Sequence, residues 1–360
     1  MADSLLFSPI TLRDTTFKNR AWVAPMCQYS ATDGVPGDWH LVHLGAFAKG
    51  GSGLVMAEAT SVSPEGRITL ADTGLWNDDQ RDAFARINRF ITDNGSVPGI
   101  QLAHAGRKAS TEIPWLSRDP LAVEDGGWQP IAPSAITHEN LTPPHAMSIA
   151  DIQRVVNEFR TAATRARDAG FQVVEIHAAH GYLIHQFLSP LTNTRSDGYG
   201  GTFEGRIRIL LDVIDAVRQE WPDRLPLFVR VSATDWADGG WTLDDTVKLS
   251  LRLQGTGVDL IDVSSGGLTS AQKITVAPGY QVPFARAVRD AQRIPVSAVG
   301  LITEPGQAEQ TLVDGGADVV MLGRVLLREP MWPLRAAKEL SAEAHWPAPY
   351  KSARYRGSIP

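Results

Sequence analysis

The chain has 360 residues, 43% of them hydrophobic, so it is long enough to bury a large core. Its formal net charge is −6 and no basic tract stands out, which argues against nucleic acid as a partner. Cys27 is the only cysteine, which excludes an intrachain disulfide, and the sequence shows neither a membrane-spanning apolar run nor a signal-peptide pattern, so we expect a cytoplasmic protein without a membrane partner.

Short apolar runs alternate with helical patterns along the chain. The runs are rich in β-branched residues, which is typical of buried strands in a parallel sheet. Eight strands are expected, at Ala21–Val23, Leu54–Ala57, Gly99–Leu102, Val173–Ile176, Leu227–Val231, Leu260–Val263, Val296–Ala298 and Val319–Leu322. Eight strand–helix units imply a closed α/β barrel, a (β/α)8 TIM barrel that forms one domain over residues 1–360. An open doubly wound sheet would usually carry a Gly-rich turn after its first strand, and Ala24-Pro25-Met26-Cys27 is not one.

Capping residues and glycines mark the ends of several helices. Helix starts are predicted at Asn77, Ser148, Thr242 and Glu304-Pro305, with the corresponding stops at Gly95, Gly170, Gly255 and near Gly315.

Three segments fall outside this alternation. Leu6–Lys18 is short and alternating, and is expected to form a hairpin that closes the barrel floor. Residues 103–147, after the third strand, show no clear helical period and many prolines and glycines; we interpret them as an insertion that caps the barrel mouth. Residues 341–360 form a proline-rich C-terminal tail.

The carboxyl ends of parallel barrel strands meet on one face, which is where active sites of such barrels lie. Gly300 and Gly323 follow the last two strands, and Arg324 comes next, a pattern typical of a phosphate site. Turn glycines beside a surface arginine are the alternative. Arg230 lies within a strand, so it needs an anionic partner, either a structural carboxylate or a bound cofactor.

Three proton-handling side chains follow the fourth strand. His177 and His180 are three residues apart, so the chain must turn after His177, near Gly181, for both imidazoles to reach one ligand. Together they could bind a metal or hold an oxygen atom. Tyr182 could then act as a general acid, since an ordinary tyrosine has a pKa of about 10. Cys27 has no evident activating base, and small apolar filling is the plainer interpretation.

Several ordered motifs resemble the Old Yellow Enzyme family of flavin-dependent ene-reductases, and most closely its thermophilic-like bacterial branch, which includes the xenobiotic reductases. The motifs are Ala24-Pro25-Met26-Cys27-Gln28-Tyr29, Glu58-Ala59-Thr60, Gln101-Leu102-Ala103-His104-Ala105-Gly106-Arg107-Lys108, Glu175-Ile176-His177-Ala178-Ala179-His180-Gly181-Tyr182 and Asn193-Thr194-Arg195-Ser196-Asp197-Gly198-Tyr199-Gly200-Gly201. The resemblance covers nearly the whole chain.

The resemblance implies bound FMN and NADPH or NADH as hydride donor. It assigns the flavin ring and its phosphate to ten residues, Ala24, Pro25, Met26, Cys27, Ala59, Gln101, Arg230, Gly300, Gly323 and Arg324. It places the substrate carbonyl oxygen on His177 and His180, and it makes Tyr182 the proton donor to Cα while the flavin gives hydride to Cβ.

The resemblance also extends to substrates and assembly. Substrates would be enones, enals, quinones or nitro compounds, with Tyr29 contributing to their pocket. A homodimer or dimer-based tetramer would bring Arg356, or alternatively Arg354, to a neighbouring subunit's site. A barrel metallohydrolase using His177 and His180 as metal ligands, and a non-catalytic flavin-binding protein, are the competing functions.

Overall fold

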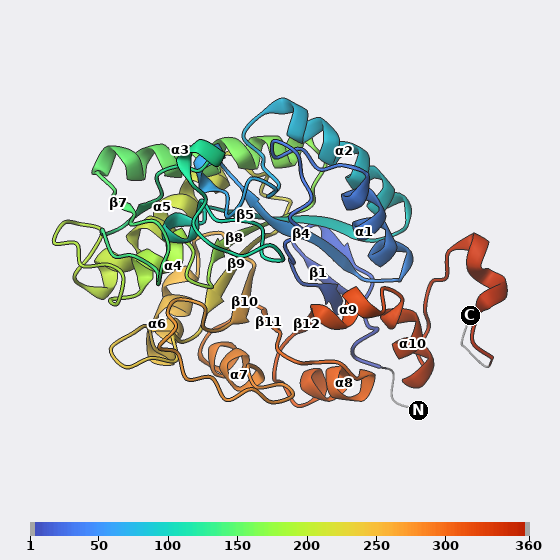
Figure 1. The fold of residues 1–360 in the computed structure, drawn as a ribbon. Helices are drawn as coiled ribbons and strands as arrows, with labels where there is room; N and C mark the ends of the chain where they lie inside the picture. The colour runs from blue at the N-terminus through green and yellow to red at the C-terminus, as the bar shows by residue number, and fades with distance from the viewer. Residues whose placement is uncertain (1–3, 357–360) are drawn as a thin grey trace.

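Eight parallel strands close into a barrel at the centre of the molecule (Figure 1). The structure is a computed structural model that describes residues 4–356. In chain order the barrel strands are β3 (Ala21–Val23), β4 (Leu54–Ser61), β5 (Val97–Ala103), β8 (Val173–Ala178), β9 (Leu227–Ser232), β10 (Leu260–Ser264), β11 (Val296–Ala298) and β12 (Val319–Leu322). Every predicted strand is present, so the expectation of a (β/α)8 barrel is confirmed.

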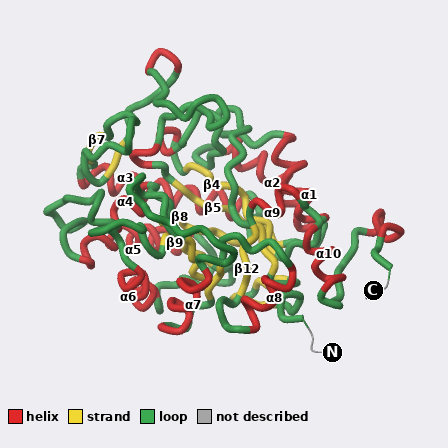
Figure 2. The backbone as a smooth tube through the Cα atoms, turned by 60° about the horizontal axis from the view of Figure 1, so that its bottom comes forward, coloured by secondary structure: helices red, strands yellow, loops and turns green. Residues whose placement is uncertain are grey.

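Helices surround the barrel, and the tube view separates them clearly from the inner strands (Figure 2). They are α1 (Asp38–Lys49), α2 (Asp78–Asp93), α3 (Ile149–Asp168), α4 (Leu183–Leu188), α5 (Phe203–Glu220), α6 (Leu243–Leu253), α7 (Val282–Ala291), α8 (Pro305–Val313), α9 (Arg324–Arg328) and α10 (Trp332–Glu339). The predicted starts are confirmed: the side chains of Asn77, Ser148 and Thr242 each accept a hydrogen bond from the backbone N–H three residues on. Among the described residues, no helix is both long and apolar enough to cross a bilayer.

The strand β4 is longer than predicted and carries a bulge. Its register with β5 shifts between Ala57 and Ala59, which leaves Glu58 unpaired in the ladder. The apolar run ends at Ala57, but the strand continues because its later polar groups find buried partners. Thr60 Oγ1 donates to the Glu58 carbonyl at 2.8 Å, and a Glu58 carboxylate oxygen lies 3.2 Å from His40 Nε2.

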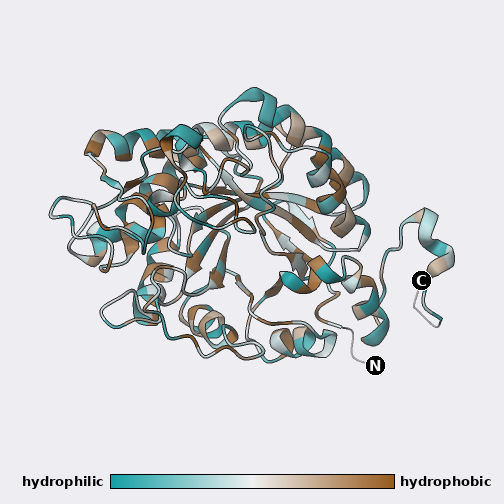
Figure 3. Cartoon of the chain, viewed as in Figure 1, coloured by the Kyte–Doolittle hydropathy of each residue, from teal (hydrophilic) through white to brown (hydrophobic). Residues whose placement is uncertain are grey.

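A hairpin closes the amino-terminal end of the barrel, as predicted. Strands β1 (Ile10–Leu12) and β2 (Thr15–Phe17) pair antiparallel. The ring of Phe17 lies 4.4 Å from that of Trp22, which stacks at 5.7 Å on Phe228 inside the barrel. The hydropathy of the residues separates the inside of the molecule from its outside: the strands at the centre are hydrophobic, and the outer faces are hydrophilic (Figure 3). The barrel floor is therefore a dry aromatic layer.

The segment 103–147 lies over the opposite end and contains little regular structure. It holds two single turns of 3-10 helix, η2 (Gly106–Lys108) and η3 (Val123–Asp125), and two short parallel strands, β6 (Ile131–Ala132) and β7 (His145–Ala146). Side chains tie it to the barrel: Arg107 donates to the Leu268 carbonyl at 2.8 Å, and Trp128 Nε1 donates to the Glu65 carbonyl at 2.8 Å.

Phe228→Ala should destabilise the protein markedly, because it opens a cavity in the aromatic floor. We expect a loss of about 3–5 kcal/mol in the free energy of unfolding, measured by urea denaturation. The control is Phe90→Ala on α2, where the ring is 37% exposed and the loss should stay below about 1 kcal/mol. Equal losses for both variants would contradict the dry floor.

Candidate functional site

Above the aromatic floor, polar side chains occupy the barrel interior. Gln101 Nε2 donates to Glu175 Oε1 at 2.7 Å across the β5–β8 pair. Ser297 Oγ donates to Asp262 Oδ1 at 2.5 Å, and the other Asp262 oxygen lies 3.0 Å from Arg230 Nε. All five are buried.

The two buried carboxyl groups differ in their partners. Burial, and then the nearby Asp262, raise the pKa of Glu175 to about 8, against the opposing charge of Arg230. Glu175 is therefore mainly protonated at neutral pH, and its partner is the neutral Gln101 amide. Asp262 is the carboxylate that faces the guanidinium.

Arg230 has more hydrogen-bond donors than the chain satisfies. Its side chain is buried, its one ion pair is with Asp262, and within residues 4–356 its guanidinium makes no hydrogen bond. A guanidinium carries five N–H donors, and buried donors are normally paired. A ligand with acceptor atoms beside Arg230 would supply the missing partners.

Arg230 borders a cavity of about 430 Å³ at the carboxyl end of the strands. The wall contains most of the residues predicted for cofactor binding, namely Ala24, Pro25, Met26, Arg230, Gly300, Gly323 and Arg324, and also His180. At Gly300 the backbone φ is 124°, and an added Cβ would lie 2.8 Å from Gln281 Nε2. Glycine is thus required for the wall to approach this closely.

The chain turns after β8 in the way that both imidazoles require. His180 and Gly181 adopt left-handed φ values of 58° and 73°. A Cβ on Gly181 would lie 2.3 Å from the Gly267 carbonyl oxygen, so glycine is needed there as well. The turn brings the His177 and His180 rings to 5.2 Å and places the Tyr182 ring 5.0 Å from His177.

The imidazoles are held neutral and oriented. His177 Nδ1 accepts the Ala179 N–H at 3.3 Å, which leaves the proton on Nε2. His180 Nε2 lies 2.7 Å from Ser264 Oγ. Burial, and then the charge of Arg230, lower the pKa of both histidines well below the ordinary value. The pair therefore offers hydrogen bonds to an oxygen atom without a positive charge.

In contrast to the imidazoles, Tyr182 keeps its proton. Burial, and then Cys27 and Asp72, raise the pKa of the phenol far above its ordinary value. Burial, and then Glu58, likewise raise the pKa of Cys27, so it is a thiol and a poor nucleophile. Burial also raises the pKa of Tyr29.

Some predicted residues lie apart from the cavity beside Arg230. Ala59 and Tyr182 line a small adjacent void with Asp72, whose pKa burial raises to about 7. Gln101 is buried against Glu175 and is not part of the cavity wall.

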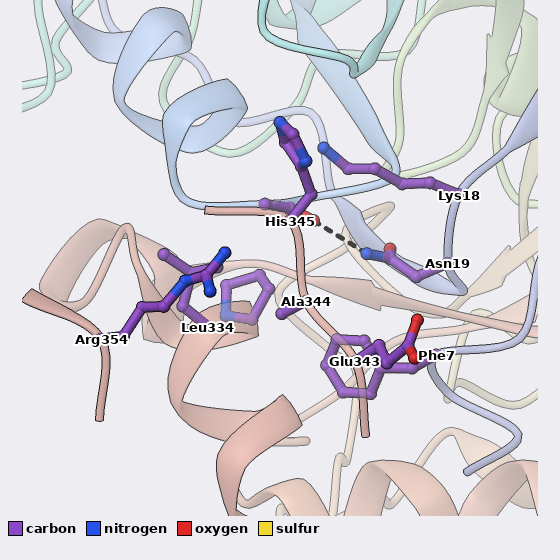
Figure 4. A pocket seen from close by; sticks show the side chains of 10 residues that line it. Phe7, Lys18, Asn19, Leu334, Glu343, Ala344, His345 and Arg354 are labelled. Carbon is purple, nitrogen blue, oxygen red and sulfur yellow. Dashed lines mark hydrogen bonds between the residues drawn. The ribbon is translucent and has the colours of Figure 1, made fainter. Parts of the chain in front are cut away.

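The two tail arginines are placed differently. Arg354 lines a separate cavity on the floor side of the barrel, near Lys18 and His345 (Figure 4). Arg356 is exposed in the tail.

The metal-ligand alternative for His177 and His180 finds no support in the described part of the chain. Within residues 4–356, no group of three or more His, Cys, Asp or Glu side chains could hold a metal ion. Structural zinc sites need four protein ligands and catalytic ones need three.

Functional candidates that the sequence did not single out are Asp72, Lys108, Glu175 and Asp262. Glu175 and Asp262 could have been noticed as lone acidic residues inside apolar strand runs, with Glu175 on the same face as His177. Asp72 lies in a loop and Lys108 at the end of the single turn η2, and no sequence pattern indicates that they lie beside Tyr182.

A buried contact between His185 and Asp235 supports the turn that carries the histidines. His185 on α4 accepts the Gly181 N–H through Nδ1 at 2.9 Å, and its Nε2 lies 2.9 Å from Asp235. Asp235 also accepts from Ser189 Oγ at 2.6 Å and from the Trp241 N–H at 2.7 Å. Burial alone would raise the pKa of Asp235, but His185 and these donors hold it below its ordinary value.

Comparison with known families is consistent with this geometry. A profile described as "NADH:flavin oxidoreductase / NADH oxidase family" matches residues 5–343. The chain is 48% identical over 352 residues to an NADPH dehydrogenase of Geobacillus thermodenitrificans, covering 97% of this chain and 98% of that protein.

Two solved structures of similar shape are a reductase and an old yellow enzyme homologue. Morphinone reductase in complex with tetrahydroNAD superposes with a TM-score of 0.78 at 28% identity, covering 98% of this chain and 94% of that chain. An old yellow enzyme homologue from Zymomonas mobilis gives a TM-score of 0.76 at 28% identity, covering 95% of this chain and 94% of that chain.

Asp235→Ala should destabilise the protein by about 3–5 kcal/mol at neutral pH, because it leaves His185, the Ser189 hydroxyl and the Trp241 N–H buried without their partner. Since the native pKa of Asp235 is lowered, its contribution is complete above the ordinary pKa of about 4 and is lost as the pH falls through the native value. Urea denaturation between pH 7 and pH 3 should show the gap between the two proteins narrowing. The exposed Asp238→Ala is the control, and a gap independent of pH would contradict the assignment.

Proposed function

This chain belongs to the NADH:flavin oxidoreductase / NADH oxidase family, and on that premise we propose that it is an ene-reductase that reduces activated C=C bonds of α,β-unsaturated carbonyl compounds. Membership of the family makes it an NAD(P)H-dependent flavin oxidoreductase of the Old Yellow Enzyme type with FMN as cofactor. One observation carries the finer proposal: two neutral imidazoles and a protonated phenol converge beside a cavity that borders Arg230.

The residues around the cavity fit FMN. Arg230 would face acceptors of the ring, because its donors lack partners within the chain. Gln101 gives its N–H to Glu175, which leaves its carbonyl oxygen for a donor on the ring. Ring contacts would come from Ala24, Pro25, Met26, Cys27 and Ala59, and phosphate contacts from Gly300, Gly323 and Arg324. When bound, FMN supplies the hydride chemistry, taking hydride from NAD(P)H and delivering it to the substrate Cβ.

The histidine pair would bind and polarise the substrate carbonyl. His177 presents Nε2–H, and His180 lies beside it at the turn. Negative charge builds on the carbonyl oxygen as the Cβ–H bond forms. Donors fixed at that oxygen stabilise the transition state by up to a few kcal/mol each. His177 is buried and His180 half-buried, so water competes little for the hydrogen bonds that they would give to the substrate.

Tyr182 would complete the reaction by protonating Cα. Its raised pKa keeps the proton in place until the carbanion character develops at carbon. Tyr29 would contribute a second phenol to the substrate pocket and Cys27 a thiol; burial raises the pKa of both groups, so both keep their protons.

Enones, enals, quinones and nitro compounds are the substrate classes that fit this donor set, and NADPH or NADH would serve as reductant. A homodimer or dimer-based tetramer, with Arg356 or Arg354 near a neighbouring subunit's site, stays a prediction from the tail motif. Analytical ultracentrifugation of the purified protein tests the assembly.

The purified protein should be yellow, with the flavin absorbance bleached by NADPH and restored by cyclohexenone under anaerobic conditions. The expected product is cyclohexanone in stoichiometric yield. Bleaching without recovery on enone addition would contradict the ene-reductase proposal while leaving a flavin oxidoreductase in place. Bound flavin without bleaching by either nicotinamide would favour the non-catalytic alternative.

Tyr182→Phe should slow reoxidation by enone about 10²-fold or more, the range of a lost general acid, while flavin reduction by NADPH changes little. Stopped-flow absorbance of the two half-reactions measures both rates. Tyr199→Phe is the matched control, since that phenol donates to Asp212 away from the cavity. Similar slowing of both half-reactions by Tyr182→Phe would speak against proton donation.

A further inference from the structure

The ammonium group of Lys108 connects the capping segment to the proton-transfer site. Lys108 ends η2, and its Nζ donates to the His180 carbonyl at 2.9 Å and to the Gly267 carbonyl at 3.0 Å. The same Nζ lies 4.9 Å from the centroid of the Tyr182 ring. The Lys108 ammonium group therefore contacts three parts of the site: the turn after β8, the loop after β10 and the ring of Tyr182.

This positive charge is not cancelled by an ion pair. Among the described residues, no carboxylate lies within ion-pair distance of Lys108; its two hydrogen-bond acceptors are neutral carbonyls. The ionisable groups that face it from the surrounding elements are Arg107, Arg118, His138, Glu139, His177, His180 and Tyr182. Burial, and then Arg107, lower the pKa of Lys108 to about 8. The lysine is thus mainly charged at neutral pH.

Tyr182 would need a positively charged neighbour at the step in which it gives up its proton. When its O–H bond breaks, a C–H bond forms at the substrate Cα with the electron pair of the former double bond, and the negative charge stays on the phenolate until solvent returns a proton. Burial, Cys27 and Asp72 all disfavour that phenolate, and only Arg118 opposes them. A cation held beside the ring in a water-poor site offsets part of this cost.

We propose that Lys108 is a positioning residue for proton transfer, whose charge, fixed by the His180 and Gly267 carbonyls, stabilises the ionised form of Tyr182. The inference rests on the proposed function, because it concerns the protonation of Cα. It also gives a reason for a half-buried lysine with carbonyl partners at this position, where a neutral side chain would be less costly to desolvate.

Two variants separate charge from hydrogen bonding. Lys108→Gln keeps N–H donors for the two carbonyls but removes the charge, whereas Lys108→Arg keeps the charge. We expect Lys108→Gln to slow reoxidation by cyclohexenone about tenfold or more, a share of the 10²–10⁴-fold effect of a general acid. Lys108→Arg should recover most of the rate. Flavin reduction by NADPH, and reoxidation by benzoquinone, which places no proton on carbon, should change less than about threefold.

Lys248→Gln, on the exposed face of α6, is the matched control and should behave as wild type in every assay. Melting temperatures of all variants report whether the loops remain assembled. Lys108→Gln at the wild-type enone rate, or equally slow with enone, benzoquinone and NADPH, would overturn the inference. A wild type that never reduces the enone overturns the proposed function, and this inference with it; the benzoquinone rate then shows that the enzyme is otherwise active.

The pH profile gives an independent readout. The wild-type enone step should slow as the pH rises through about 8, because Lys108 loses its charge there. Asp72 and Glu175 titrate in the same range, so the comparison with Lys108→Gln is decisive. The alkaline decline should shrink in that variant, and an unchanged decline would count against Lys108 as its source.

Discussion

The Arg230–Asp262 pair inside the barrel is the interaction on which the electrostatics of the barrel mouth depend. Its guanidinium is fixed by one carboxylate on the neighbouring strand and otherwise faces the cavity. The same charge contributes to the low pKa of His177 and His180 and opposes the raised pKa of Glu175. A neutral residue at this position would remove the donors that lack partners and the positive charge that, after burial, lowers the pKa of both imidazoles.

Burial lowers the pKa of the two histidines and raises the pKa of Tyr182 and Cys27, and this difference separates two kinds of side chain in the site. A low-dielectric environment disfavours the charged form of every group. The imidazoles therefore lose their proton and become hydrogen-bond donors without charge, whereas Tyr182 and Cys27 keep theirs. Under the proposed function, the neutral imidazoles would bind the substrate oxygen, and Tyr182, in the adjacent void, would hold the proton.

The sequence alone predicted the barrel well, because buried parallel strands leave apolar runs and helix caps leave a local signature. Asn77, Ser148 and Thr242 were recognisable from residue type and spacing. The convergence of His177, His180 and Tyr182 was also foreseeable, since Gly181 marked the turn. Lys108 and Asp72 could not be found in this way: their place beside Tyr182 comes from contacts with segments distant in the sequence, and neither a loop nor a single helical turn carries a periodicity. The length of β4 was missed for a related reason, because its polar end is stabilised by tertiary partners.

The bulge in β4 decides which residue enters the barrel. Ala57 pairs with Ile100 and Ala59 pairs with Gln101, so the extra residue between them moves Glu58 off the inward row and towards His40 on α1. Without that single insertion, Glu58 would stand opposite Gln101 and add a third acid to an interior that already holds Glu175 and Asp262. Chimeras that exchange this strand between related barrels must therefore conserve its number of residues as well as its composition. Otherwise Glu58 would face the barrel interior at the place that Ala59 now occupies.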